Sequence, residues 1–582
     1  MTLTTTEARG VATGQPDLWC TYAALRTLAW LRRPDGVVQP QATARYLASR
    51  RNANGGYAWS RGMASDAWAT YYCTQGLADL ARLGVSDQKA AGLDRTRDWL
   101  RSTWSGSAFA MMPGQLPDAW ATFFSTRTTL ETCGEDVPDR ERLLAWLGAL
   151  QAPDGGLGWT PEYAEDGVSD VRACFYGVMA WRALTRTGDA PAPWDTGRLI
   201  SWMRDQQSAE GGFRFSPAAD VPCMWATYRT TAALAALGTG PADPEACAAW
   251  IARLRGPGGA FVRWDGYGVE DVWASFCAVG SLVAMGKPAD AYAEDVTRRM
   301  TELACAGGGY TYREPALAAD ALATAAALLA GSPEAAADDG EPLRRWLEGC
   351  LLPNEGGVMY MPARGSEVRC TLWALEAGAF RRDQASRKRV ADWLRDLQNP
   401  DGGFGYWEGR GSDVVSTVSA IEVRRLLGPS HRDALDTEAL LGFLDACRTE
   451  EGSGNVPGAA PTLRATLQAL RARELAGRPE PGAVREALDR HRVSSGGYAN
   501  EGRRIPDLLT TYEAVLTADR YQIPVDIAHL RAFCDRVVTP GGTAWTPLAP
   551  PEGSDRLADC LGTLLLRRAK GQPGTLPALT LS

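Results

Sequence analysis

RVADWLRDLQNPDGGFGYWEGRGSDVVSTVSAIEVRRLLG, residues 389–428, shows the unit from which this chain is built. Residues 389–398 alternate polar and apolar side chains at helical spacing, which predicts an amphipathic helix. The following Pro-Asp-Gly-Gly ends that helix, because proline cannot continue it and glycine tolerates a positive φ. Residues 413–428 are apolar on nearly every face, and Asp413 can cap this second helix. The stretch therefore predicts a hairpin of an outer and an inner helix.

The same order of elements recurs along the chain. Gly-Gly pairs begin at positions 55, 155, 211, 258, 308, 356, 402, 496 and 541, which is the spacing of a repeat array. The expected inner helices open at twelve positions: Asp17, Asp66, Asp118, Asp170, Cys223, Asp271, Asp320, Glu367, Asp413, Thr462, Asp507 and Asp555. We predict an all-α protein of two α/α toroids with about six hairpins each.

The composition excludes several classes of protein. The chain has 582 residues, a net charge of −8 and 45% hydrophobic residues, which is typical of a globular protein. An acidic chain without a Lys/Arg cluster is a poor partner for nucleic acid. Its 13 cysteines contain no CxxC pair and stand singly in apolar stretches, as expected of free thiols in a reducing cytoplasm. No apolar run predicts a transmembrane segment, although peripheral membrane contact stays possible.

Two turns carry a family resemblance. Gln151-Ala-Pro-Asp-Gly-Gly-Leu-Gly-Trp159 and Gln398-Asn-Pro-Asp-Gly-Gly-Phe-Gly-Tyr-Trp407 look like the QW motifs of squalene-hopene cyclases. The chain, over about residues 15–570, resembles the superfamily of class II terpene cyclases and protein prenyltransferase β subunits. In such a motif we expect the Gln to bind backbone groups at the outer helix end and the Trp to stack across repeats, as a staple between hairpins.

The resemblance implies a catalytic acid, and the acid is missing from its usual place. Class II cyclases protonate a double bond with the third residue of a DxDD motif at the start of an inner helix. Here the pattern is Asp-x-Trp-Ala-Thr, so Trp273 stands in the acid's position. The nearest candidates are Glu270 and Asp271. The alternative for Asp271 is a helix cap worth about 1 kcal/mol, since nine copies of one residue cannot all be catalytic.

The position two residues after each cap differs between the halves of the chain. In the first half it holds Trp19, Trp68, Trp120, Arg172, Trp225 and Trp273. If this position faces the ring interior, as in the cyclases, the indoles would stabilise cations and contact an isoprenoid tail. The alternative is that these indoles pack between helices. Arg172 would hold a diphosphate head group, or else pair with Asp170.

Metal and cofactor chemistry has little support in the sequence. The chain has three histidines and no Cys/His group at ligand spacing, which disfavours the zinc site of the prenyltransferases. We predict no cofactor, with Mg²⁺ as a companion only if the substrate is a diphosphate.

These observations leave three hypotheses open. The first is a divergent class II terpene cyclase acting on a linear isoprenoid or its diphosphate. The second is a non-catalytic toroid that binds an isoprenoid, a peptide or a partner protein, and the third is a sugar-processing toroid. For the domains we expect a tail at 1–14, a Trp-rich toroid at 15–290, a second toroid at 291–570 and a tail at 571–582.

Overall fold

The structure is a computed structural model. It describes residues 10–59, 64–87, 90, 92–188, 190–219, 221–352, 355–362, 364–408, 410–502, 505–548, 555–572 and 575–581. These residues divide into two compact units. The first contains Gly14–Ala318 with a short contribution at Arg410, and the second contains Ala319–Glu408, residues 10–13 and the residues from Ser412 onward.

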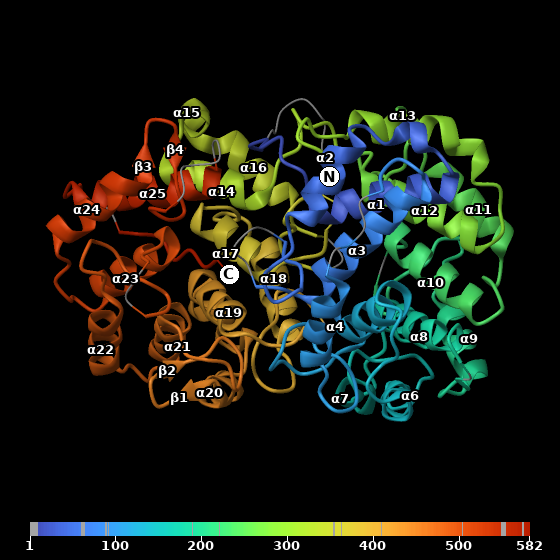
Figure 1. Ribbon diagram of the computed structural model, residues 1–582, viewed down its shortest axis with the longest axis horizontal. Coiled ribbons are helices and arrows are strands. Elements are labelled where there is room, and N and C mark those ends of the chain that lie inside the picture. The colour runs from blue at the N-terminus through green and yellow to red at the C-terminus, as the bar shows by residue number, and fades with distance from the viewer. Residues whose placement is uncertain are drawn as a thin grey trace. The chain divides into compact units, whose positions relative to one another are not determined.

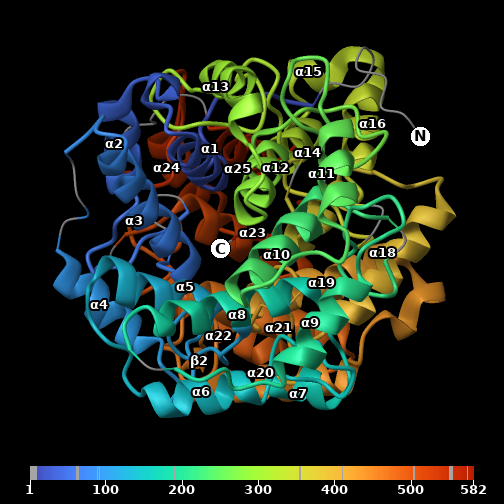
Figure 2. The ribbon, with the colours of Figure 1, turned by 90° about the vertical axis from the view of Figure 1, so that its right-hand side faces the viewer.

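The first unit is a closed ring of six inner helices surrounded by outer helices (Figure 2). The inner helices are α1 Leu18–Leu31, α3 Ala67–Arg82, α5 Ala119–Arg127, α8 Val171–Thr185, α10 Met224–Ala236 and α12 Val272–Ala284. Each packs against the next, and α12 packs against α1. The outer helices are α2 Pro40–Ala48, α4 Leu93–Ser102, α6 Arg140–Gly148, α9 Thr196–Asp205, α11 Pro244–Arg253 and α13 Ala293–Glu302. Shorter segments are α7 Pro161–Glu165, η1 Pro34–Gly36, η2 Thr128–Thr132 and η3 Asp290–Tyr292.

The second unit repeats this plan (Figure 1). Its inner helices are α14 Ala321–Ala330, α17 Val368–Glu376, α19 Val414–Leu427, α21 Leu463–Leu475, α23 Leu508–Arg520 and α25 Arg556–Ala569, and α25 packs against α14 to close the ring. Its outer helices are α16 Glu341–Gly349, α18 Gln384–Leu397, α20 Thr437–Ala446, α22 Pro481–His491 and α24 Ile527–Val537. The remaining elements are α15 Pro333–Ala336, η4 Ala337–Gly340, η5 Pro429–Ala434 and the antiparallel pairs β1 Arg448–Thr449 with β2 Gly452–Ser453 and β3 Val538–Thr539 with β4 Gly542–Thr543. The predicted all-α pair of toroids is confirmed.

The predicted starts of the inner helices are confirmed residue by residue. All twelve positions named from the sequence are the N-cap residues of inner helices. In ten of them the cap side chain accepts a hydrogen bond from the first turn, and only Cys223 and Glu367 do not. The aspartates therefore recur because each inner helix leaves backbone N–H groups that need an acceptor.

The glutamines of the Gly-rich turns connect successive outer helices. Gln398 donates from Nε2 to the carbonyl oxygen of Asp436, and the N–H of Asp436 donates back to Oε1 of Gln398. Asp436 is the N-cap of α20, the next outer helix. The same pair of bonds joins Gln151 to Asp195 and Gln207 to Asp243. The predicted backbone bonds of the Gln are present, and their partner is the start of the next outer helix. The Trp part of the prediction is not matched by stacking, since Trp159 lies tilted by 39° to Trp120 with ring centroids 6.0 Å apart.

The first ring closes later in the chain than expected. We placed the boundary at residue 290, but the unit extends to Ala318 and includes the outer helix α13. The N–H of Tyr310 donates to Oγ1 of Thr21, and the N–H of Asp17 donates to the carbonyl of Tyr310, each at 3.0 Å. The turn after α13 therefore binds the start of α1, which fixes α1 in the first ring.

The two expected tails contain ordered, buried residues within the second unit. Val11 is 5% exposed, and its N–H donates to Oγ1 of Thr324 at 3.0 Å. Leu579 is 1% exposed, and Leu576, Ala578, Thr580 and Leu581 are buried as well. Apolar residues explain this, since 576–581 reads Leu-Pro-Ala-Leu-Thr-Leu.

Candidate functional site

Five tryptophans meet inside the first ring. Trp19 lies against three of the others, with ring centroids 5.0 Å from Trp68, 5.5 Å from Trp225 and 4.7 Å from Trp273. Trp120 joins through Trp68 at 4.6 Å. None of the five is more than 7% exposed. The position two residues after each cap does face the ring interior, but the five indoles at this position contact one another.

A second aromatic layer lies one turn further along the inner helices. Tyr22 stacks on Tyr72 with centroids 4.2 Å apart, and Phe276 lies 5.9 Å from Tyr22. Phe124 and Tyr176 extend the layer on the other side of Tyr72 and Trp120. Aromatic rings thus form much of the interior of the first ring, and their π faces favour apolar chains and cations. Charged side chains are buried beside them: Arg26 pairs with Asp79, and Arg229 lies over Trp225 and Tyr176.

Arg263 brings a positive charge to this aromatic interior. Its guanidinium carbon lies 3.9 Å from the ring centroid of Trp225, and the residue is 1% exposed. It comes from the Gly-rich turn before α12. Its positive charge opposes the rise that burial causes in the pKa of Asp271. A buried cation stacked on an indole at this distance is a strong cation–π contact.

Asp271 is a buried carboxyl with one oxygen occupied. Its Oδ1 accepts the N–H of Ala274 at 2.6 Å, and the residue is 1% exposed. Its Oδ2 is buried and meets no hydrogen-bond donor among the residues that the structure describes. Burial raises the pKa of Asp271 to about 7, against the lowering effect of the helix N-terminus and Arg263. At pH 7 about half of the molecules therefore carry a proton on Asp271, and that proton is available for transfer.

Asp118 is a second carboxyl of the same kind. It caps α5 through a 2.7 Å bond from the N–H of Ala121 and is 2% exposed. Burial raises the pKa of Asp118 to about 7, and Arg410 of the same unit opposes that rise. No described donor reaches its Oδ2 with hydrogen-bond geometry, although the backbone N–H of Gly411 lies near enough to lower the pKa of Asp118.

Glu270, the other acid expected from the sequence, has its carboxylate engaged. It accepts the N–H of Gly258 at 2.6 Å and the N–H of Ala260 at 3.2 Å. Arg299 lies 4.0 Å away. Glu270 thus supports the Gly-rich turn before α12.

Arg172 pairs with its own cap residue. Its Nε and Nη2 donate to the two oxygens of Asp170 at 2.9 and 2.8 Å, and its guanidinium lies over Trp159 and Phe215. Arg369 pairs in the same way with Glu367. The ion pair considered as the alternative from the sequence is therefore present in both rings.

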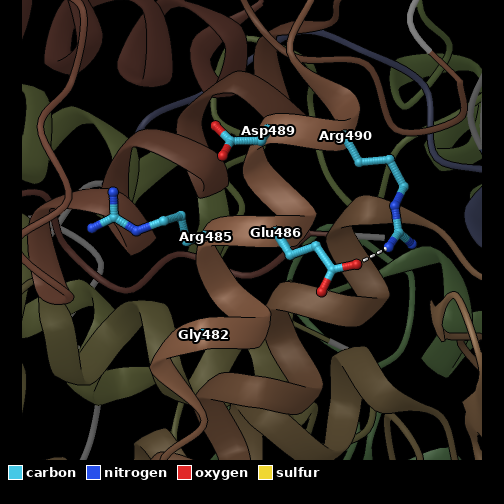
Figure 3. Close-up of a pocket in the computed structure, with 5 residues that line it drawn as sticks. All are labelled: Gly482, Arg485, Glu486, Asp489 and Arg490. Atoms are coloured by element: carbon cyan, nitrogen blue, oxygen red, sulfur yellow. Dashed lines mark hydrogen bonds and ion pairs between the residues drawn. The ribbon is translucent and has the colours of Figure 1, made fainter.

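Neither the surface hollow on α22 nor any group of metal-ligating side chains in the described residues forms a site. Figure 3 shows a hollow along α22, lined by Gly482, Arg485, Glu486, Asp489 and Arg490. All five come from one outer helix, and Glu486 pairs with Arg490 at 2.6 Å, so this is a mixed-charge outer face. Within the residues described, no three His, Cys, Asp or Glu side chains gather as a metal site. None of the described helices has the length and apolar character needed to cross a bilayer.

The sequence did not lead us to Arg263 or Asp118 as site residues, and only Arg263 left a signal in it. Arg263 occupies the place that Trp159 holds in its own turn, since the carbonyl of each accepts the first N–H of the preceding inner helix. An arginine at a position held by Trp, Phe or Tyr in other repeats could have been noticed. Asp118 could not be told from its eight equivalents, because its distinction is the lack of a second partner.

A family model for the prenyltransferase alpha-alpha toroid domain matches residues 4–67, 57–195, 174–359 and 360–480. The chain belongs to this family.

Solved structures of toroid proteins are also similar to this member of the family. Ent-copalyl diphosphate synthase from Streptomyces platensis is 15% identical, with 97% of this chain and 96% of that chain covered and a TM-score of 0.41. Protein geranylgeranyltransferase-I from Candida albicans, complexed with GGPP, is 16% identical over 45% of this chain and 87% of that one, with a TM-score of 0.36. The type II terpene cyclase MstE from Scytonema is 15% identical over 43% and 87%, with a TM-score of 0.31. A search of curated proteins gives no significant match. At these identities the likeness concerns the fold alone.

Proposed function

We propose that the chain is a divergent class II terpene cyclase that converts a linear isoprenoid, or its diphosphate, into a cyclic product. The observation that carries this proposal is Asp271, a buried carboxyl with a pKa of about 7 and an unpartnered oxygen. It starts the same inner helix as Trp273, one of the five clustered indoles. A proton donor and cation-stabilising rings at one end of a toroid suit a reaction that begins by protonating an alkene.

Asp271 would open the reaction. The π electrons of a terminal double bond take its proton, so a C–H bond forms, the O–H bond breaks and a tertiary cation remains. The new carboxylate is stabilised by the N–H of Ala274 and the charge of Arg263. The indoles and the second aromatic layer stabilise the cation while further double bonds add to it, and loss of a proton ends the reaction. Because the indoles contact one another in the structure, a substrate must separate them on entry.

Asp118 and Glu270 take lesser parts in this proposal. Asp118 shares the properties of Asp271 but stands beside Trp120, which contacts Trp68 of the cluster. Glu270 would act indirectly, by holding the turn that precedes α12. For a diphosphate substrate, Arg172 would have to leave Asp170 to bind the head group, with Mg²⁺ as its companion. The 13 free cysteines agree with a cytoplasmic enzyme.

Product analysis tests the proposal. Purified protein is incubated with farnesyl diphosphate, geranylgeranyl diphosphate or squalene, with and without Mg²⁺, and products are identified by mass spectrometry. We expect a cyclic product that is lost in Asp271→Asn and retained in Asp243→Asn, which changes an exposed cap of the same ring. No cyclic product from any of the three substrates, or equal activity of both variants, would refute it.

The mutual packing of the indoles favours a second candidate, a toroid that binds an isoprenoid or a partner without catalysis. A filled interior needs no acid, and repeats copy packing residues whatever the function. Quenching of tryptophan fluorescence by geranylgeraniol, without any turnover, would support this candidate over the first. The structure disfavours the sugar-processing alternative. A platform for pyranose rings needs exposed indole faces, and the five clustered indoles are at most 7% exposed.

A further inference from the structure

The interior of the second ring is occupied by a segment of the chain itself. Residues 576–581 form neither helix nor strand, and Leu576, Ala578, Leu579, Thr580 and Leu581 are all buried. Figure 1 shows the end of the chain among α17, α19 and α23. The segment makes hydrogen bonds to α17, α19, α21 and α23, which are four of the six inner helices. A segment that is hydrogen-bonded to four inner helices of one ring lies inside that ring.

Most of these hydrogen bonds go to the main chain of the segment. The indole Nε1 of Trp373 donates to the carbonyl of Thr580 at 3.1 Å, and the hydroxyl of Tyr512 donates to the carbonyl of Pro577 at 2.9 Å. The guanidinium of Arg464 donates to the carbonyl of Leu581. The N–H of Ala578 lies near the carboxylate of Glu376 and opposes the rise that burial causes in its pKa. Ring side chains thus recognise peptide groups, which every peptide carries.

The side chains of the segment restrict the kind of peptide that the site can bind. Three leucines and an alanine are buried against the ring, and the hydroxyl of Thr580 lies 2.5 Å from that of Ser419. Beside residues 578–580 remains a cavity of about 30 Å³, also lined by Glu422, Arg471 and Arg520. That volume is about the share of one water molecule in the liquid. The segment therefore fills its site nearly completely.

The charges around the site explain why a hydrocarbon would suit it poorly. Glu513 binds Gln468 at 2.7 Å and Arg464 at 3.3 Å, and it is 5% exposed. Burial raises the pKa of Glu513 and of Glu376. An isoprenoid in place of the segment would leave the buried Trp373 and Tyr512 without the carbonyl oxygens that Thr580 and Pro577 supply, and buried groups without partners are costly. Arg464 and Glu376 would keep Glu513 and Arg425 as partners. A peptide satisfies Trp373 and Tyr512.

We propose that the interior of the second ring is a binding site for a short apolar peptide, which residues 576–581 occupy in cis. The site recognises the peptide through main-chain hydrogen bonds from inner helices and through apolar contacts for the leucines. A peptide of the same chemistry in trans binds when the chain's own segment is absent or displaced. The site is separate from the acid and the indoles of the first ring and does not depend on the function proposed for them.

Truncation tests the site directly. The probe is the peptide Thr-Leu-Pro-Ala-Leu-Thr-Leu, residues 575–581, labelled with fluorescein and followed by anisotropy, and the protein ends at Gln572. We expect saturable binding to the truncated protein and none to the full chain. Tyr512→Phe in the truncated protein removes one hydrogen bond and should weaken binding about fivefold. Glu486→Gln, on the outer face of α22, serves as the matched control and should change nothing.

A second measurement decides the case if the truncated protein does not fold. A protease site placed between Gln572 and Thr575 of the full chain is cut after folding, and native mass spectrometry follows the released piece. We expect it to stay bound and then to exchange with added labelled peptide. Three results would overturn the proposal: a folded truncated protein that does not bind the peptide, a cut protein that never exchanges it, or geranylgeraniol binding where the peptide does not.

Discussion

Replacing Asp271 by Asn should make the protein more stable at pH 8 while abolishing its activity. The pKa of Asp271 is about 7 in the folded chain, against 3.8 for an unperturbed aspartate. Below pH 3.8 the carboxyl is neutral in both the folded and the unfolded chain, so it affects stability little. Between pH 3.8 and 7 only the unfolded chain releases the proton, so the folded state loses stability as pH rises.

The size of the effect follows from the shift. About three pKa units correspond to about 4 kcal/mol, which is reached near pH 7 and stays constant above it. Asn caps a helix about as well as Asp and carries no charge, so Asp271→Asn removes this cost. We expect the free energy of unfolding of the variant to exceed that of the wild type by up to about 4 kcal/mol at pH 8 and by almost nothing at pH 4.

Urea unfolding followed by tryptophan fluorescence is the assay. Sixteen of the 21 tryptophans precede residue 290, so the signal reports mainly on the first ring. Asp243→Asn, at the exposed cap of α11, corrects for any change due to capping alone. Curves for wild type and Asp271→Asn that run parallel from pH 4 to pH 8 would refute the burial argument. In the activity assay, kcat/KM of the wild type should fall above pH 7 as Asp271 loses its proton.

Three further predictions concern the fold. Trp19→Ala removes the indole that touches three others, so it should destabilise the first ring by about 3–5 kcal/mol in urea unfolding, and a change below 1 kcal/mol would mean that the cluster is loosely packed. Gln398→Ala cuts the connection to Asp436 and should lower the free energy of unfolding by about 1–2 kcal/mol in calorimetry, with Gln151→Ala giving a similar loss; no loss in either would show that the staple is dispensable. Glu422→Gln should destabilise the second ring by about 3–5 kcal/mol, because Glu422 is 1% exposed and is the common partner of Arg425, Arg471 and Arg520. Although burial opposes it, those arginines lower the pKa of Glu422, so the cost of Glu422→Gln should shrink when pH falls below about 4, and a cost that does not depend on pH would contradict this reasoning.

The repeat, its caps and its turns could be predicted because their causes are local. An aspartate after a Gly-rich turn must cap the next helix, and Gln398 has backbone groups within reach. The closure of the first ring could not be predicted in the same way. The turn at Tyr310 resembles every other turn, and only the three-dimensional path shows that it binds Thr21 of α1.

The candidate site could likewise be predicted only in those features that have local causes. The positions of the five indoles follow from the register of the repeat, but whether they line a space or fill it depends on how five side chains from different helices meet. Asp170 and Asp271 both cap inner helices, but the sequence already offered Arg172 as a partner for Asp170, and the structure contains that ion pair. The shifted pKa of Asp271 arises from burial, which the residue's own segment does not determine.

The bond between Tyr310 and Thr21 has a consequence for synthesis. The two residues are 289 positions apart, so α1 leaves the ribosome long before its partner turn exists. At about 5–20 residues per second, that interval lasts about 15–60 s. During it the largely apolar α1, with Trp19 near its start, has α3 beside it but no α12 or α13. The nascent first ring is therefore an open arc with an unpaired edge, which chaperones would be expected to cover until the second half of the chain begins to emerge.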